Sequence, residues 1–268
     1  MAAPDHALSF AGGALTVAVA DGFATVTLNR PETRNALTAG MWRALPEVAA
    51  RLAADEGVRA VLIRGAGERA FSGGADIAEF PEVYATAESA RAYNDAVRAG
   101  QDAVARLPMP VVAVVFGACV GGGCGLALSC DLRFAAEGAR FGIPPARLGA
   151  AYSFADTRQL VELVGPARAK DILFSGRLLP AEEALRIGLC DRVLPEAALV
   201  AEAEGYARAV ADLSAVSVRT SKRMVRAILD GADAETAEHR GWLDAAFASD
   251  DFAEGYAAFL EKRPPRFR

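Results

Sequence analysis

The segments FSGGADI at residues 71–77 and FGACVGGGCG at residues 116–125 decide how this sequence folds. Each follows a run of β-branched and apolar residues, and each precedes a run with helical spacing. Glycine lets the main chain approach a ligand closely and adopt dihedral angles that other residues avoid. A strand–glycine–helix turn also leaves the first N–H groups of the helix unpaired and directed outward. Two such turns side by side would direct two N–H donors at one oxygen atom, which is an oxyanion hole.

These glycines do not fit the common nucleotide-binding patterns. Neither segment ends in the Lys-Ser/Thr pair of a P-loop. In a dinucleotide fingerprint beginning at Gly121, the third glycine would fall on Leu126. Glycines that serve only tight turns and packing remain an alternative, because short glycine motifs often occur without a ligand.

Outward from the two turns, strands and helices alternate through the first half of the chain. A hairpin is predicted over residues 15–28, with its turn at Ala20-Asp21-Gly22. Thr38 is predicted to cap a helix that runs to about Asp55, and a second helix is predicted over about 86–107. The other predicted strands are 59–63, 111–116, 132–135 and 140–141, and the predicted helices after residue 154 are 156–164, 166–174, 181–187, 196–212, 215–229, 233–248 and 252–261. This order predicts an α/β fold with a layered core and a helical tail.

Composition excludes several classes of protein. The 268 residues are 53% hydrophobic and 24% charged, which is too apolar for intrinsic disorder. A net charge of −5 without a basic block argues against a nucleic acid as the partner. Residues 1–10 lack the charged start of a secretory signal, and glycines interrupt the longest apolar run. We therefore expect a soluble, cytoplasmic protein that does not bind a membrane.

Cysteine and histidine content limits the chemistry further. The four cysteines contain no C-x-x-C pair, and three of them lie in an apolar stretch, so buried structural thiols are expected at Cys119, Cys124, Cys130 and Cys190. Only two histidines are present: His6, in what we expect to be an N-terminal tail, and His239, in a predicted helix. A metal site or a Ser-His-Asp triad is therefore not expected.

Four segments, in this order along the chain, resemble the crotonase (enoyl-CoA hydratase/isomerase) superfamily. They are LNRPETRNAL at 28–37, FSGGADI at 71–77, the glycines of 121–125, and FAEGYAAFLEKR at 252–263. The resemblance covers about residues 13–267. It implies a crotonase-like spiral of ββα units over residues 1–195, a C-terminal helical trimerisation region over 196–268, and homotrimers that pair into hexamers. It also implies an acyl-CoA thioester substrate, with coenzyme A as part of the substrate and no separate cofactor.

The resemblance also implies roles for individual residues. The N–H groups of Ala75 and Gly122 match the oxyanion hole around the thioester carbonyl. Coenzyme A contacts fall on Arg34, Ala36, Gly73, Asp76 and Ile77, and Phe259 and Lys262 match positions that approach the coenzyme A of a neighbouring subunit. A lysine suits a phosphate as a point charge, although a solvated surface lysine is the alternative at this position.

The sequence departs from the pattern where hydratases of this superfamily carry two catalytic glutamates. Those positions hold Gly125 and Pro145, and neither residue can transfer a proton. Classical hydration is therefore not expected. Tyr152 matches a tyrosine in decarboxylases that act on methylmalonyl-CoA-like substrates, and Ser153 lies where some isomerases and dehalogenases carry an aspartate. The histidine that those decarboxylases place in the first oxyanion turn is Ala75 here.

Several interpretations therefore stay open. The leading one is an enzyme that stabilises a thioester enolate, with decarboxylation favoured because it needs no general base, only an oxyanion hole and a proton from Tyr152 or water. The other is a non-catalytic acyl-CoA-binding scaffold. Tyr152 could equally be a packed aromatic residue, and Ser153 with Asp156 could form the N-cap of the next helix. A glutamate from elsewhere, such as Glu79 or Glu82, could replace the missing pair, although both fit a solvated helix face.

Overall fold

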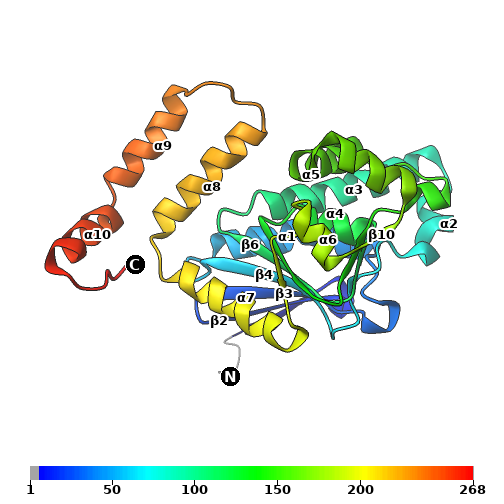
Figure 1. Cartoon of the computed structure of the whole chain (residues 1–268), viewed down its shortest axis with the longest axis horizontal. Coiled ribbons are helices and arrows are strands. Elements are labelled where there is room, and N and C mark those ends of the chain that lie inside the picture. The colour runs from blue at the N-terminus through cyan, green and yellow to red at the C-terminus, as the bar shows by residue number, and fades with distance from the viewer. Residues whose placement is uncertain (1–5, 268) are drawn as a thin grey trace.

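Two β-sheets form the core of the computed structural model, which describes residues 6–267 (Figure 1). The larger sheet has the strand order β1 (His6–Phe10), β2 (Leu15–Ala20), β3 (Phe23–Leu28), β4 (Ala60–Gly65), β6 (Val111–Val115), β8 (Leu132–Ala136) and β11 (Arg192–Leu194). The smaller sheet has the order β10 (Leu178–Pro180), β9 (Arg140–Gly142), β7 (Ala118–Val120) and β5 (Ala70–Ser72).

The chain winds between these sheets as a spiral. It passes from β4 to β5, from β6 to β7 and from β8 to β9, so each turn supplies one strand to each sheet. Successive turns pair in parallel: β4 with β6 and β6 with β8 in the large sheet, and β5 with β7 and β7 with β9 in the small one. The helices that follow these strand pairs are α3 (Ala87–Ala105), α4 (Gly122–Leu128) and α5 (Phe154–Ser175). The predicted α/β fold, a spiral of ββα units, is confirmed.

Helix α1 (Ala39–Ala54) shows how local sequence builds these elements. The Thr38 hydroxyl accepts a hydrogen bond from the N–H of Met41 at 3.1 Å, which is the predicted N-cap. Met41, Leu45 and others at helical spacing form a stripe that is buried in the core. Helix α3 packs closely against α1. Gly100 on α3 permits this approach, because a Cβ there would lie only 3.0 Å from the Trp42 ring on α1.

Short-range signals predict the hairpin well and miss the shortest strands. The turn between β2 and β3 places Asp21 and Gly22 at positive φ, as a tight hairpin requires. His6 begins strand β1, which pairs with β2, so the expectation of a tail at this residue is wrong. The sequence patterns do not predict strands β5, β7, β10 and β11 either. They have three residues each and carry no alternation long enough to detect.

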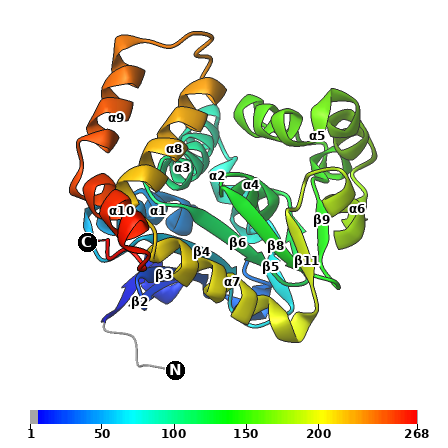
Figure 2. The ribbon, with the colours of Figure 1, turned by 60° about the vertical axis from the view of Figure 1, so that its left-hand side comes forward.

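The C-terminal helices divide into two groups. Helix α6 (Ala181–Arg186) and helix α7 (Glu196–Ala211) lie on the core, and α7 buries Leu199, Ala203 and Ala207 against the large sheet. Helices α8 (Ala215–Leu229), α9 (Ala237–Phe247) and α10 (Asp250–Glu261) extend away from the core as an arm (Figures 1 and 2). The division of the chain at residue 195 stays a prediction, with α7 packed on the core side.

The four cysteines are all buried. Each side chain is at most 4% exposed, and all four thiols are free. Burial raises the pKa of Cys130 to about 12 and that of Cys190 to about 11, so both keep their protons at neutral pH. The prediction of buried structural thiols is confirmed. Within residues 6–267, no helix combines the length and the apolar character needed to cross a membrane.

Candidate active site

The two glycine turns meet where β5 and β7 end. The strands are parallel neighbours, so the turns that follow them emerge at the same edge of the small sheet. Gly74 has a φ of +104°, and Gly121 has a φ of +53°. A Cβ on Gly74 would lie 2.9 Å from the Val120 carbonyl oxygen and 3.6 Å from the Gly122 nitrogen. Glycine is therefore required here by both the dihedral angle and the close approach.

The amide groups of Ala75 and Gly122 lie close together at this contact. A Cβ on Gly122 would lie 3.7 Å from the Ala75 nitrogen, so the two N–H groups belong to one small region. Within residues 6–267, neither of these N–H groups donates to another group. The neighbouring amides are occupied, since Leu37 N–H donates to Gly74 O at 2.7 Å and Asp76 N–H donates to Leu37 O at 2.9 Å. The turn is thus held rigidly while two donors stay available.

Asn35 anchors the loop that supports the first turn. Its side chain is 1% exposed and donates to the carbonyl oxygens of Ala66 and Ala70, at 3.1 and 2.8 Å. Its carbonyl oxygen accepts from the N–H of Arg30 at 3.1 Å. Arg34 and Asn35 both have a φ of +55°, an uncommon angle outside glycine that this hydrogen bonding sustains.

Four of the residues predicted to contact coenzyme A come together in this loop. Gly73 N–H donates to the Arg34 carbonyl at 2.8 Å. The Arg30 guanidinium donates to the Ala36 carbonyl and to the Asp76 carboxylate, each at 2.8 Å. The Asp76 side chain also accepts from Ala78 N–H at 3.2 Å, so it shapes the loop through its own hydrogen bonds.

The remaining predicted contacts lie at the surface. Ile77 follows Asp76 directly and is 56% exposed. Phe259, on α10, is 82% exposed, and Lys262 ends that helix at a φ of +55°. Helix α10 lies on the arm, at the other end of the molecule from α2 (Phe80–Val83), which follows the first glycine turn (Figure 1). Contact of Phe259 and Lys262 with a neighbouring subunit stays a prediction.

Polar side chains fill the space above Gly125, one turn along α4 from Gly122. A Cβ on Gly125 would lie 2.5 Å from Gln101 Nε2, 2.8 Å from Asp156 Oδ1 and 3.0 Å from the Tyr152 hydroxyl. A side chain at residue 125 would therefore require the ends of these side chains to shift. Pro145 begins the short helix η4 (Pro145–Leu148) and is half-buried.

Asp156 is the centre of the cluster and is 6% exposed. Its Oδ1 accepts from Gln101 at 2.7 Å, and its Oδ2 accepts from the Ser153 hydroxyl at 2.5 Å. Burial raises the pKa of Asp156, and the hydrogen bonds from Ser153 and Gln101 partly oppose that rise. Ser153 also accepts from the N–H of Asp156 at 3.0 Å, so it is the N-cap of α5, one of the two alternatives considered for it.

The Tyr152 hydroxyl lies beside this cluster. The oxygen is fully buried and has no hydrogen-bond partner among residues 6–267, although the residue as a whole is only partly buried. Burial raises the pKa of Tyr152 well above its ordinary value, and the nearby Asp156 charge raises it further. The hydroxyl therefore keeps its proton at neutral pH.

Neither Glu79 nor Glu82 belongs to the polar cluster above Gly125. The Glu79 carboxylate accepts from the N–H of Ala39 at 2.7 Å and thereby caps the first turn of α1. Glu82 is exposed on α2. The buried carboxylate beside the glycine turns is Asp156 instead.

Sequence reasoning missed Gln101 as a site residue. It lies on α3 at helical spacing from Tyr93 and Val97 before it and from Val104 after it, and it is 4% exposed. A glutamine on an otherwise apolar stripe is a detectable signal, because a buried amide needs a partner. The partner is Asp156, 55 residues further along the chain.

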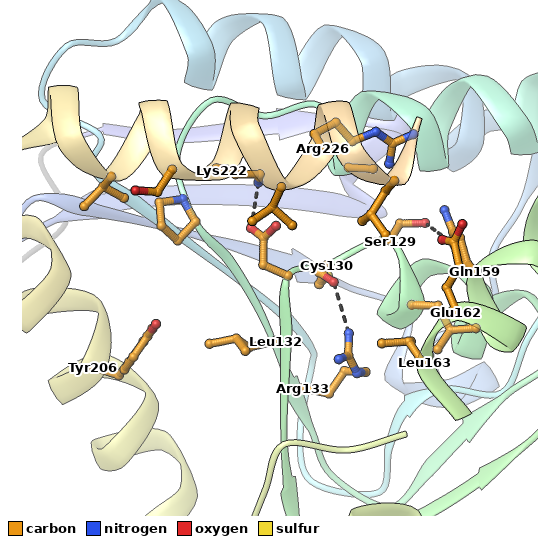
Figure 3. A pocket seen from close by; sticks show the side chains of 18 residues that line it. Ser129, Cys130, Leu132, Arg133, Gln159, Glu162, Leu163, Tyr206, Lys222 and Arg226 are labelled. Atoms are coloured by element: carbon orange, nitrogen blue, oxygen red, sulfur yellow. Dashed lines mark hydrogen bonds and ion pairs between the residues drawn. The ribbon is translucent and has the colours of Figure 1, made fainter. Parts of the chain in front are cut away.

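A separate cavity of about 470 Å³ lies between α8 and the core (Figure 3). Its apolar wall includes Leu132, Tyr206 and Val225. The Lys222 ammonium group donates to the Asp131 carboxylate at 2.6 Å and to the Met109 carbonyl at 2.9 Å, which ties α8 to the core. The glycine turns are not part of this cavity, so we assign it to the joint between core and arm.

The described residues contain no group of three or more His, Cys, Asp or Glu side chains arranged to hold a metal ion. The polar groups at the glycine turns are instead two amide donors, a tyrosine hydroxyl and a hydrogen-bonded carboxylate.

Comparisons with known proteins agree on one family. The family model described as enoyl-CoA hydratase/isomerase matches residues 18–268. A short-chain-enoyl-CoA hydratase of Clostridium acetobutylicum is 36% identical over 241 residues, which is 90% of this chain and 92% of that protein. A crotonyl-CoA hydratase of Syntrophomonas wolfei is 34% identical over 248 residues, covering 91% and 94% of the two chains. The crystal structure of an enoyl-CoA hydratase/carnitine racemase from Magnetospirillum magneticum superposes with a TM-score of 0.91 at 37% identity, over 95% of each chain.

Proposed function

Because this chain belongs to the enoyl-CoA hydratase/isomerase family, we propose that it is an acyl-CoA enzyme that stabilises a thioester enolate without adding water. The leading reaction is decarboxylation of a malonyl-type acyl-CoA. The observation that carries this proposal is the pair of available N–H groups at Ala75 and Gly122, next to a helix face that bears no carboxylate of its own.

The N–H pair supplies the electrostatic part of the reaction. Two fixed donors that approach one thioester oxygen stabilise the negative charge that develops there as an enolate forms. Removing one such donor typically costs about 10²–10³ in kcat. The hydrogen bonds around Leu37 and Asp76 keep the first donor in place before the substrate arrives.

We infer that the reaction is not hydration from the residues at positions 125 and 145. The two named relatives are hydratases. In hydratases of the family, one glutamate activates water and a second delivers the proton. This chain has Gly125 and Pro145 at the matching positions, and the space above Gly125 is already filled by Gln101, Asp156 and Tyr152. A water molecule held by a side chain on residue 125 has no place here.

Decarboxylation needs only the N–H pair and a proton donor such as the Tyr152 hydroxyl. The bond between the α-carbon and the carboxylate breaks, carbon dioxide leaves, and the electron pair of that bond becomes the enolate held by the N–H pair. A new C–H bond then forms with the proton of the Tyr152 hydroxyl, and the resulting phenolate regains a proton from solvent. No general base is required, in agreement with a hydroxyl that stays protonated.

The loop at residues 30–37 and the turn at Gly73–Ile77 would hold coenzyme A. We propose that the main chain of Arg34 and Ala36 contacts coenzyme A, since both lie in the loop that Asn35 and Arg30 fasten to the glycine turn. We further propose that Phe259 and Lys262 serve the site of a neighbouring subunit in a homotrimer or a hexamer. Their exposure on the arm supports this assignment.

The test is mass spectrometry of the purified protein incubated in D₂O with crotonyl-CoA, methylmalonyl-CoA and a saturated acyl-CoA. Loss of carbon dioxide from methylmalonyl-CoA, slowed in Tyr152→Phe, is the expected result. Fast hydration of crotonyl-CoA would overturn the interpretation of Gly125 and Pro145. Tight binding of all three esters without turnover would instead support the non-catalytic scaffold.

A further inference from the structure

Two arginines carry buried donors that the chain itself does not satisfy. Within residues 6–267, four buried side-chain nitrogen or oxygen atoms have no hydrogen-bond partner. Two of the four, Nη1 of Arg59 and Nε of Arg219, belong to side chains that line the same cavity. A buried donor without a partner is destabilising, and more so when the group is charged. Both guanidinium groups are therefore available to an acceptor that enters this cavity.

The cavity lies where the arm joins the core and measures about 1190 Å³. Arg59 comes from the core, directly before β4, and Arg219 comes from the second turn of α8. The first turn of α10 and the segment after it complete the wall, and Figure 2 shows them beside the start of α8. The cavity shares no lining residue with the glycine turns or with the smaller cavity of Figure 3, so it is a separate site.

Hydrogen bonds hold both sides of the cavity in place. On the core side, the N–H of Arg59 donates to the Gly22 carbonyl at 2.8 Å and fixes the residue that precedes β4. On the arm side, the Asp251 carboxylate accepts from the Ser214 hydroxyl at 2.7 Å, which joins the start of α10 to the start of α8. The walls are thus formed by contacts within the chain.

The carboxylates around the cavity do not neutralise the two arginines. Glu254 accepts hydrogen bonds from the Arg263 guanidinium at 2.6 and 2.9 Å, so its charge is already paired. Asp251 is occupied by the serine hydroxyl described above. Glu56 and Asp250 are exposed, where solvent and salt screen their charges.

Arg59 and Arg219 keep their positive charges in the inner part of the cavity. Both are half-buried, and neither forms an ion pair within residues 6–267. A guanidinium group matches the oxygens of phosphate with its fork of N–H donors. A phosphate monoester carries a charge of about −1.5 to −2 at neutral pH, which balances two arginines.

We propose that this cavity binds the phosphate group of a small molecule between Arg59 and Arg219. The buried nitrogen of each arginine donates to a phosphate oxygen. The volume exceeds the range of about 300–1000 Å³ that is common for ligand pockets, so there is room for the molecule that carries the phosphate. Because one arginine belongs to the core and the other to the arm, the bound phosphate holds α8 against the core. The site does not depend on the reaction proposed above.

Thermal unfolding with inorganic phosphate tests the site. Sodium phosphate replaces sodium chloride stepwise, at fixed pH and ionic strength, and calorimetric titration gives the stoichiometry. We expect the Tm of the wild-type protein to rise and one phosphate to bind per chain. Acetate should leave the Tm unchanged, because one charge does not balance two arginines. An equal rise with acetate would reveal a general effect of anions and would overturn the site.

The variants Arg59→Met and Arg219→Met separate binding from structural support. Each should weaken phosphate binding by about 10- to 100-fold, the loss expected for one hydrogen bond to a charged group. In buffer without phosphate, each should melt at the same temperature as the wild-type protein or higher, because a charged donor without a partner has been removed. An arginine that only supports the structure would give a lower Tm in that buffer.

Arg223→Met is the matched control. Arg223 lies one turn further along α8, where its guanidinium carbon is 4.2 Å from the centre of the Trp242 ring, and it does not line the cavity. This variant should bind phosphate as the wild-type protein does. Equal weakening in Arg223→Met would mean that the overall charge of α8 attracts the anion. Unchanged affinity in both Arg59→Met and Arg219→Met would place the phosphate elsewhere, and either result would overturn the proposal.

Discussion

Gly123, in the first turn of α4, lies directly against Ser72 at the end of β5. A Cβ on Gly123 would lie 2.5 Å from the Ser72 Cβ and 2.8 Å from its hydroxyl and carbonyl oxygens. Ser72 is fully buried, and its hydroxyl accepts from Gly74 N–H at 3.2 Å. The missing side chain therefore lets the two glycine turns touch, and this contact sets the spacing of the Ala75 and Gly122 N–H groups.

Gly123→Ala should force the turns apart. We expect a loss of about 1–3 kcal/mol in the free energy of unfolding from overpacking. Turnover should fall by about 10²–10³, because one N–H donor leaves its position. Urea denaturation and steady-state kinetics measure the two effects.

Gly205→Ala is the control for that substitution. Gly205 lies inside α7, and a Cβ there meets nothing within 4 Å. The change should raise stability by about 0.5–1 kcal/mol and leave kcat unchanged. Equal kinetic loss in both variants would show that the contact with Ser72 is irrelevant to activity.

Asn35→Ala should damage the loop proposed to hold coenzyme A. The Asn35 side chain satisfies the carbonyls of Ala66 and Ala70 and the N–H of Arg30. Each buried group left without a partner costs about 1–3 kcal/mol. We expect lower stability and a higher KM for acyl-CoA. Asn29→Ala, at an exposed residue that makes one hydrogen bond to Gly13, should change neither by a comparable amount.

The pH dependence of stability should report the burial of Asp156. Its folded-state pKa is raised above the ordinary value of 3.8, mainly by burial. The folded state thus binds this proton more tightly than the unfolded state does. That contribution is fully present below about pH 3.8 and is lost as the pH rises through the folded pKa.

Asp156→Asn removes this dependence. The Tm of the variant minus that of the wild-type protein should increase from acid pH toward neutrality and then become constant. Thermal melts at a series of pH values measure the difference. A difference that shrinks with rising pH would mean that the folded protein favours the ionised form.

Lys222→Met should loosen the arm. The Lys222 ammonium group is held by the Asp131 carboxylate and the Met109 carbonyl and is mostly buried. Hydrogen bonds to charged groups contribute about 1.5–3 kcal/mol each. We expect faster proteolytic cleavage near residues 212–214, with the core left intact. Arg240→Met removes an exposed pair with Glu235 and should cost at most about 1 kcal/mol without changing the cleavage rate.

Local chemistry explains which parts of the fold were predictable. The Thr38 cap, the Asp21-Gly22 turn and the two glycine turns are each specified by a few neighbouring residues, and each was predicted. The break in α5 at Gly165, with a φ of +75°, also agrees with the two helices predicted there. Strands β10 and β11 depend on partners elsewhere in the chain, so their own three residues do not reveal them.

The site was predictable to the same extent. The resemblance of four segments to the crotonase superfamily implies a common ligand for Arg34, Ala36, Gly73 and Asp76, and hydrogen bonds in the structure bring these residues together. The pairing of Gln101 with Asp156 did not, because helical periodicity gives the face of each helix but not which faces meet. Only the packing of α3, α4 and α5 shows that Gly125 leaves room for a carboxylate from another helix.

Because all four cysteines are buried, the rate of thiol labelling measures how often the core of the native protein opens. A thiol reagent added to the native protein should react only as fast as the core exposes Cys119, Cys124, Cys130 and Cys190, since each is at most 4% exposed. Three of them lie on or beside β7 and α4, the elements that carry the second glycine turn. Labelling in the presence and absence of an acyl-CoA would therefore show, residue by residue, whether ligand binding slows the breathing of the segment on which the proposed chemistry depends.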